Sequence, residues 1–244
     1  MAIIDSTKEF FQDVWANKTK RYIAIGIGAG VLLILLIIII AAASSGSKSK
    51  GGNDNSDSFK IEYVKPDCTG YCSKPYNIEV YSDKTISSKL IQCGYQKNSN
   101  LLNFVIEAVK THNILRACHN AKPLLPNCEI MKISQDYAKT MPNGHSGTEF
   151  HGEWMGENLY WSTGKSLNGA DPINKWYSEI DNYNFNTHTS KGGVIGHFTQ
   201  VVWKNSKEIG IGYYCSGSSC CVVGNYYPGG NMIGDYANNV QNLR

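Results

Sequence analysis

The longest apolar stretch of the chain runs from Ile23 to Ala43 and contains no charged and no strongly polar side chain. A helix of that length spans about 30 Å, the thickness of the hydrocarbon core of a bilayer. The pattern predicts an uncleaved transmembrane signal anchor over residues 22–43, behind a tail at 1–21. The alternative is a signal peptide cleaved near the small residues that end this stretch, but the stretch is longer than the roughly 7 to 15 apolar residues typical of one.

The residues that flank this segment predict its orientation. Lys18, Lys20 and Arg21 abut its N-terminal end, whereas the first lysines after it follow a spacer of small residues. All eight cysteines follow the segment, which favours an oxidising compartment for the rest of the chain. We therefore expect a single-pass type II membrane protein, with its C-terminal domain in the secretory lumen or outside the cell. Residues 44–58, rich in Gly, Ser, Asn and Asp, are expected to form a flexible linker.

Beyond the linker, the hydrophobic pattern changes from helical spacing to alternation. Apolar residues recur at helical spacing over 102–113 and again over 130–141, where Pro142-Asn143-Gly144 ends the pattern. Asp171-Pro172 is typical of the start of a third helix. Strands are predicted at 198–203, 209–215 and 221–227, the last two joined by a hairpin loop at 216–219. Helices followed by strands indicate an α+β domain, which we place at 98–244.

Residues 59–97 form a cysteine-containing stalk or extension, which either packs against the larger domain or stands alone as a loop-rich segment. A zinc knuckle here would need four ligands, and the segment supplies three cysteines and no histidine. Adjacent strand residues point to opposite faces, so only one of Cys220 and Cys221 is expected to pair with Cys215. Two more disulfides are candidates: Cys68–Cys72, closing a small loop, and Cys118–Cys128.

Four motifs together identify a family resemblance. They are, in chain order, His112-Asn113-Ile114-Leu115-Arg116, Gly156-Glu157-Asn158-Leu159, the run from Gly196-His197-Phe198 to Trp203, and the run from Asn225-Tyr226-Tyr227 to Asn231. In this order the chain resembles the CAP superfamily (cysteine-rich secretory, antigen 5 and pathogenesis-related-1 proteins) over roughly residues 101–240. The run from Trp176 to Phe185 resembles the Golgi-associated plant pathogenesis-related subgroup. The resemblance implies an α-β-α sandwich with a central antiparallel sheet.

The resemblance also implies a site. It places the family's two histidines and two acids at His145, Glu157, Glu179 and His197, facing one cleft. Two imidazoles and two carboxylates suit a divalent metal such as Zn²⁺, with the carboxylates orienting the imidazoles or holding a water. From the residues alone, each has a structural alternative; Glu179, for example, follows Lys175 by four positions, as in an ordinary surface pair.

Function is expected to be binding, and catalysis is the alternative. The chain has neither a His-Glu-x-x-His run nor a Gly-x-Ser-x-Gly elbow, and only Ser162 and Thr163 follow the glutamate motif as candidate nucleophiles of a hydrolase. His151 and His188 are expected on loops. The resemblance implies sterols, fatty acids, anionic lipid head groups, divalent metal or protein partners as ligands, and a homodimer is a separate expectation. A third hypothesis is an adhesion or assembly module with a vestigial cleft. A net charge of +3 from scattered residues disfavours nucleic acid.

Overall fold

The computed structural model describes residues 59–244. The tail, the anchor segment and the linker predicted over residues 1–58 lie outside the described residues, so the membrane topology stays a prediction. In the described part of the chain, no helix combines the length and the apolar character needed to cross a bilayer.

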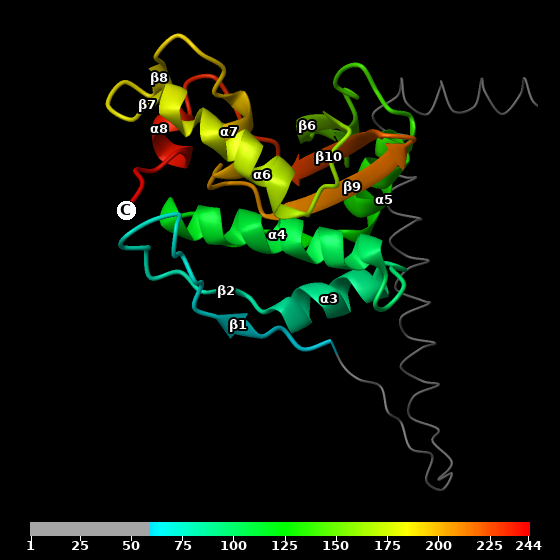
Figure 1. Cartoon of the computed structure of the whole chain (residues 1–244). Coiled ribbons are helices and arrows are strands. Elements are labelled where there is room, and N and C mark those ends of the chain that lie inside the picture. Colours follow the sequence, from blue (N-terminus) through cyan, green and yellow to red (C-terminus); the bar gives the residue numbers. More distant parts are fainter. Residues whose placement is uncertain (1–58) are drawn as a thin grey trace, which may run out of the picture. The chain divides into compact units, whose positions relative to one another are not determined.

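A four-stranded sheet forms the centre of the described unit (Figure 1). Its strands are β3 (Leu125–Pro126), β9 (Glu208–Ser216), β10 (Ser219–Tyr227) and β6 (Gly156–Thr163), in that order across the sheet. All neighbours are antiparallel except the short β3, which pairs in parallel with β9. The predicted hairpin is confirmed, since β9 and β10 pair along their whole length from Ser216 opposite Ser219. The α+β class is confirmed with it.

Helices cover both faces of this sheet. On one face lies α5 (Cys128–Lys139), which comes so close that a Cβ at Gly210 or Gly212 would overlap the backbone of α5. On the other face lie α4 (Asn100–Cys118) and α6 (Ala170–Tyr177); Phe104 of α4 stacks on Tyr213 of β9 at a ring separation of 3.9 Å. Glycine is required at these two positions of β9 because any side chain there would collide with α5.

The two helices predicted from apolar spacing and the third predicted from Asp171-Pro172 are present. Ser99 begins α4 by accepting the N–H of Leu102, and Asn127 begins α5 in the same way through Glu129 and Ile130. The second helix ends at Lys139, slightly before the predicted 141. The shorter elements are β4 (Glu149–Phe150), β5 (Glu153–Trp154), the 3₁₀ helix η1 (Ser178–Asn182), β7 (Tyr183–Asn184), β8 (Thr189–Ser190) and α8 (Tyr236–Asn239).

One predicted strand is wrong. The β-branched run 198–203 belongs mostly to a short helix, α7 (Gly196–Val201). Its residues Phe198 to Val201 are all buried. The carboxylate of Glu179 accepts the N–H groups of His197 (2.9 Å) and Phe198 (3.3 Å), which stabilises the first turn of the helix. Tertiary contacts of this kind override the strand preference of valine and phenylalanine.

Residues 59–97 pack against the rest of the described unit. They contain β1 (Tyr63–Val64), β2 (Val80–Tyr81) and α3 (Asp83–Gln92), and α3 runs beside α4 (Figure 1). Ile86 and Leu90 of α3 are fully buried in the main core. Of the two alternatives left open by the sequence, packing is the one found.

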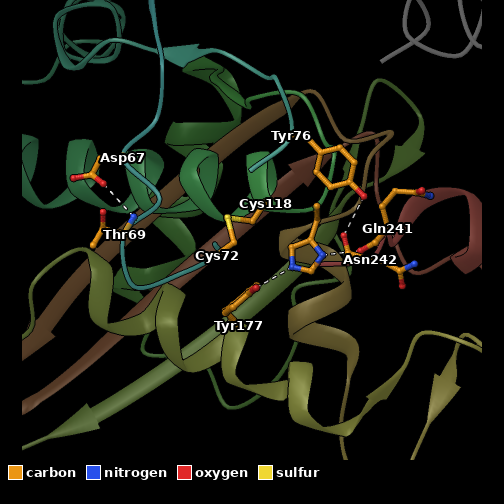
Figure 2. Close-up of a disulfide and its surroundings, with 9 residues drawn as sticks. Asp67, Thr69, Cys72, Tyr76, Cys118, Tyr177, Gln241 and Asn242 are labelled. Carbon is orange, nitrogen blue, oxygen red and sulfur yellow. Dashed lines mark hydrogen bonds between the residues drawn. A yellow bond between two sulfur atoms is a disulfide. The ribbon is translucent and has the colours of Figure 1, made fainter. Parts of the chain in front are cut away.

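Two disulfides attach this segment to the helices, and they correct the predicted pairing. Figure 2 shows the bond from Cys72 to Cys118 at the end of α4, and a second bond joins Cys93 to Cys128 at the start of α5. The predicted pairs Cys118–Cys128 and Cys68–Cys72 are therefore wrong, and Cys68 is a buried free thiol. Spacing along the chain misled the prediction because α4 and α5 each meet a cysteine of the segment 59–97 instead of each other.

The third disulfide confirms the hairpin argument. Cys215 and Cys220 face each other across β9 and β10 and are bonded. Cys221 points to the opposite face, where it is buried with Ala138, Leu159 and Val223.

Candidate functional site

The first candidate pair is His145 with Glu157. Glu157 lies at the start of β6, and His145 lies in the loop that follows α5. The carboxylate of Glu157, only 7% exposed, accepts Nδ1–H of His145 at 3.0 Å. It also accepts the N–H (2.8 Å) and the hydroxyl (2.6 Å) of Ser146. Three donors satisfy this nearly buried carboxylate and fix its orientation.

The second pair is His197 with Glu179. Glu179 lies in η1, and its Oε1 accepts Nδ1–H of His197 at 2.6 Å. Burial by itself would raise the pKa of Glu179. The hydrogen bond and charge of His197, together with the N–H groups of Phe198 and His197, outweigh burial and hold the pKa of this carboxyl below its ordinary value. Glu179 is therefore a carboxylate at neutral pH.

Both pairs define the tautomer of their imidazole. A carboxylate only accepts hydrogen bonds, so Nδ1 must carry the proton in each ring and Nε2 of a neutral ring keeps its lone pair. The histidine side chains are 63% exposed at His145 and 32% exposed at His197. A histidine that donates to a carboxylate through one nitrogen and binds metal through the other is a common arrangement in metal sites. The donor set therefore fits a divalent metal such as Zn²⁺, with the histidines as ligands and the glutamates as orienting groups.

Asn158 connects the two pairs. It follows Glu157 in β6, and its side-chain amide donates to the carbonyl of His197 (3.0 Å) and to the hydroxyl of Tyr226 (3.3 Å). Each histidine nevertheless remains with its own glutamate. Within residues 59–244, the only group of three His, Cys, Asp or Glu ligand atoms that all lie within 4.8 Å of one another is Cys68, Cys72 and Cys118. No three of the ligand atoms of His145, Glu157, Glu179 and His197 meet this criterion, so the described residues form two histidine–glutamate pairs and not one cluster of four.

A buried network behind Asn158 was not predicted as part of the site. His112 donates from Nδ1 to the carbonyl of Ala108 (2.8 Å), and its Nε2 accepts the hydroxyl of Tyr226 (2.7 Å). Burial lowers the pKa of His112 to about 3, partly opposed by the hydrogen bond to Ala108. His112 is therefore neutral and holds Tyr226 where Asn158 can reach it. The motif that begins at His112 was the sequence signal for this network, but nothing in its spacing showed the partners.

The remaining candidates lie away from the pairs. Ser162 and Thr163 occupy the far end of β6, and five or six strand residues from Glu157 correspond to roughly 16–20 Å. His151 lies in the exposed turn between β4 and β5, and His188 accepts or donates at Nδ1 with the hydroxyl of Tyr183 (3.1 Å). The two histidines are on loops, as predicted.

Comparison with known proteins gives the family. The family model for CAP, the cysteine-rich secretory protein family, matches residues 109–226. The chain is 38% identical over 134 residues to the human Golgi-associated plant pathogenesis-related protein 1, covering 53% of this chain and 85% of that protein. The chain belongs to the CAP family. This CAP chain is also 35% identical over 125 residues to tobacco pathogenesis-related protein 1C, covering 50% of this chain and 74% of that protein.

A solved structure of NaASP2 with Zn²⁺ is 23% identical to the CAP chain, with a TM-score of 0.45, and the match covers 61% of this chain and 90% of that one. The matched family region of the CAP chain contains His145, Glu157, Glu179 and His197, together with the motif at 112–116. The matched region begins at residue 109, so the segment 59–97 lies outside it.

Proposed function

We propose that this protein acts by binding, and that the imidazoles of His145 and His197 bind one divalent metal such as Zn²⁺. The observation that supports this is the pair of Nδ1–carboxylate hydrogen bonds, at 3.0 Å for His145 and 2.6 Å for His197. Each bond leaves Nε2 of a neutral ring as the free ligand atom. A bound metal would supply a fixed positive charge with open coordination positions for an anionic ligand.

The placement of the hydroxyl groups favours binding over hydrolysis. The hydroxyl of Ser146 donates to Oε2 of Glu157 at 2.6 Å, so it anchors the carboxylate instead of meeting an imidazole. A serine nucleophile needs a general base at hydrogen-bond distance. Ser162 and Thr163 are at the other end of β6, where Thr163 contacts Ser219.

The test is zinc titration calorimetry on the full chain in neutral detergent. Replacing His145 and His197 together by asparagine removes both Nε2 atoms but leaves an amide that can still donate to the glutamates. We expect this double variant to lose zinc binding at neutral pH. The matched control is His151→Asn with His188→Asn, which removes two histidines from loops and should bind zinc as the wild type does.

Acidification supplies a second measurement. Imidazole binds metal only when it is unprotonated, and free histidine takes up a proton near pH 6.5, so zinc affinity should fall steeply between neutral pH and pH 5. Equal zinc affinity in the wild type and the His145→Asn/His197→Asn variant would refute the metal site. Saturable ester or peptide turnover that this variant abolishes would assign the protein to the hydrolase alternative.

A second candidate function is the binding of an amphiphile such as a fatty acid or sterol. A pocket of about 480 Å³ is lined in part by Ile195, Ile233 and Tyr236. Ile233 is 98% exposed and the neighbouring Met232 is 62% exposed. Adjacent exposed apolar side chains beside a pocket are typical of a ligand or membrane contact. Ile233→Ser should weaken binding of a fluorescent fatty acid several-fold, whereas Ile91→Ser, at an exposed isoleucine of α3, should not.

We further propose that binding takes place in the secretory pathway or at the cell surface. Three disulfides require an oxidising compartment, and the human relative is named as Golgi-associated. The signal anchor proposed at 22–43 would tether the domain near a membrane, where even weak contacts with anionic lipid or a protein partner gain from a high local concentration. Protease protection of sealed vesicles tests this: a C-terminal tag should resist protease added outside them. Digestion of that tag would refute the topology.

A further inference from the structure

A groove of about 660 Å³ lies between the segment 59–97 and the matched family region, away from the two histidine–glutamate pairs. One wall carries Tyr63 and Tyr81 of β1 and β2. The other carries Lys122, Lys204 and Lys207. We call these five residues and the hollow between them the lysine groove. Neither half of the chain forms it alone.

The charge of the lysine groove is unbalanced. It contains three ammonium groups and a single carboxylate, that of Glu79. All three lysines are exposed, and in the part of the chain that the structure covers none of them forms an ion pair. Unpaired cations gathered around a hollow attract an anionic ligand with several charges.

A buried arginine holds the segments that carry these lysines. Arg116 of α4 is fully buried, and its guanidinium donates to the carbonyls of Lys122 (2.8 Å), Trp203 (2.8 Å) and Ser206 (2.8 Å), besides that of Val201 (3.0 Å). Three of these acceptors, Lys122, Trp203 and Ser206, belong to the two loops that present Lys122, Lys204 and Lys207, and Val201 is the last residue of α7. The arginine therefore fixes the backbone of one wall, and its own charge, which pairs with no carboxylate among residues 59–244, adds to the positive potential there.

The opposite wall offers aromatic rings. Tyr63 and Tyr81 lie with ring centroids 5.1 Å apart, and Tyr63 is 50% exposed. The faces of such rings pack against the C–H faces of sugar rings, because both surfaces are flat and weakly polar. A membrane surface would instead be met by apolar side chains that project outward. Flat rings along a hollow, opposite a row of cations, fit a chain of sugars that carries anionic groups.

We propose that the lysine groove binds a sulfated oligosaccharide, with the sulfate groups on Lys122, Lys204 and Lys207 and a sugar ring on Tyr63. This site is separate from the proposed metal site and does not depend on it. It would allow the protein to attach to the acidic glycans of a cell surface or of a secreted matrix.

The test is binding of a heparin octasaccharide to the full chain in neutral detergent, measured at low and at physiological ionic strength. The groove variant is Lys122→Gln/Lys204→Gln/Lys207→Gln. The control is Lys97→Gln/Lys175→Gln/Lys191→Gln, which removes the same charge from exposed lysines elsewhere. Because an exposed charge pair contributes a factor of about two to five in affinity, the groove variant should bind roughly tenfold or more weakly, and the control within about twofold of wild type.

Tyr63→Leu tests the aromatic wall separately. It keeps an apolar side chain but removes the ring, so affinity should fall several-fold while its dependence on salt stays unchanged. Equal losses in the two lysine variants would overturn the proposal in favour of general surface charge. No effect of Tyr63→Leu would overturn the sugar contact. Binding to phosphatidylserine vesicles that requires the groove lysines, without octasaccharide binding, would overturn it in favour of a lipid head group.

Discussion

The two buried histidines make stability fall as the solution is acidified. Burial lowers the pKa of His112 to about 3 and that of His119 to about 4. His119 donates to the carbonyl of Gln241 (2.6 Å) and accepts the hydroxyl of Tyr177 (2.8 Å), so protonation would break its second bond, as it would the Tyr226 bond of His112. In the unfolded chain both rings take up a proton near pH 6.5. Between these pKa values the unfolded state binds more protons, and the free energy of unfolding decreases as pH falls.

The expected loss follows from linkage. The free energy of unfolding at pH 5 is lower than at pH 8 by about 2 kcal/mol for each buried histidine. The reason is that the same histidine in the unfolded chain is almost fully protonated at pH 5. Urea unfolding of the wild type at pH 8, 6.5 and 5 should therefore show a decrease of about 4 kcal/mol. His112→Gln, which cannot titrate, should lower stability at pH 8 but reduce the decrease to about half.

Glu179 contributes little to the pH dependence expected between pH 8 and pH 5. Glu179, whose pKa is lowered, contributes stability that is present above the pKa of an unfolded glutamate and is lost only as pH falls toward its own folded pKa. Its contribution is therefore nearly constant from pH 8 to 5. An unchanged pH dependence in His112→Gln would refute the claim that the neutral buried ring causes the effect.

Two further changes test the packing. Gly212→Ala should lower the free energy of unfolding by about 1–3 kcal/mol, because its Cβ would overlap the carbonyl of Ser134 in α5. The control Gly144→Ala adds a methyl group in open space and should change stability little. Similar unfolding midpoints for the two variants would contradict the close approach of α5 to β9. Replacing both Cys72 and Cys118 by serine should lower the free energy of unfolding by about 4 kcal/mol, because this disulfide joins residues 46 positions apart. Replacing both Cys215 and Cys220 should lower it by about 2 kcal/mol, because that disulfide joins residues only 5 positions apart. Equal losses by urea unfolding would show that loop length does not govern these bonds.

The buried polar residues of α4 anchor three other segments of the chain. Asn113 holds the backbone of Leu124 through both its amide and its carbonyl (3.1 and 2.7 Å), and Arg116 binds four carbonyls. His112 reaches Tyr226 and thereby Asn158, next to Glu157. One helix therefore positions the loop after it, the segment after α7 and the strand that carries part of the candidate site.

Local patterns predicted the parts of the fold that local physics determines. The helices α4 and α5 follow from apolar spacing, and the hairpin of β9 and β10 follows from alternation and its loop. The same reasoning failed at 198–203. There the β-branched run is mostly helical, because its side chains are buried and the carboxylate of Glu179 stabilises the first turn of α7. A fully buried apolar segment carries no periodicity that distinguishes the two.

The sequence alone determined the α+β class and the family motifs, and the resemblance to the family nominated the four residues of the candidate site. The tertiary structure determined which of these residues contact one another. It joined each histidine to one glutamate through Nδ1, bonded Cys72 and Cys93 to the helices of the family region, and brought Tyr63 opposite Lys122. These pairings connect residues far apart along the chain, from 12 positions for His145 and Glu157 to 46 for Cys72 and Cys118 and 59 for Tyr63 and Lys122. Propensity and periodicity act over a few neighbouring residues, so contacts at such separations arise only when the packed helices and sheet bring distant segments to the same place.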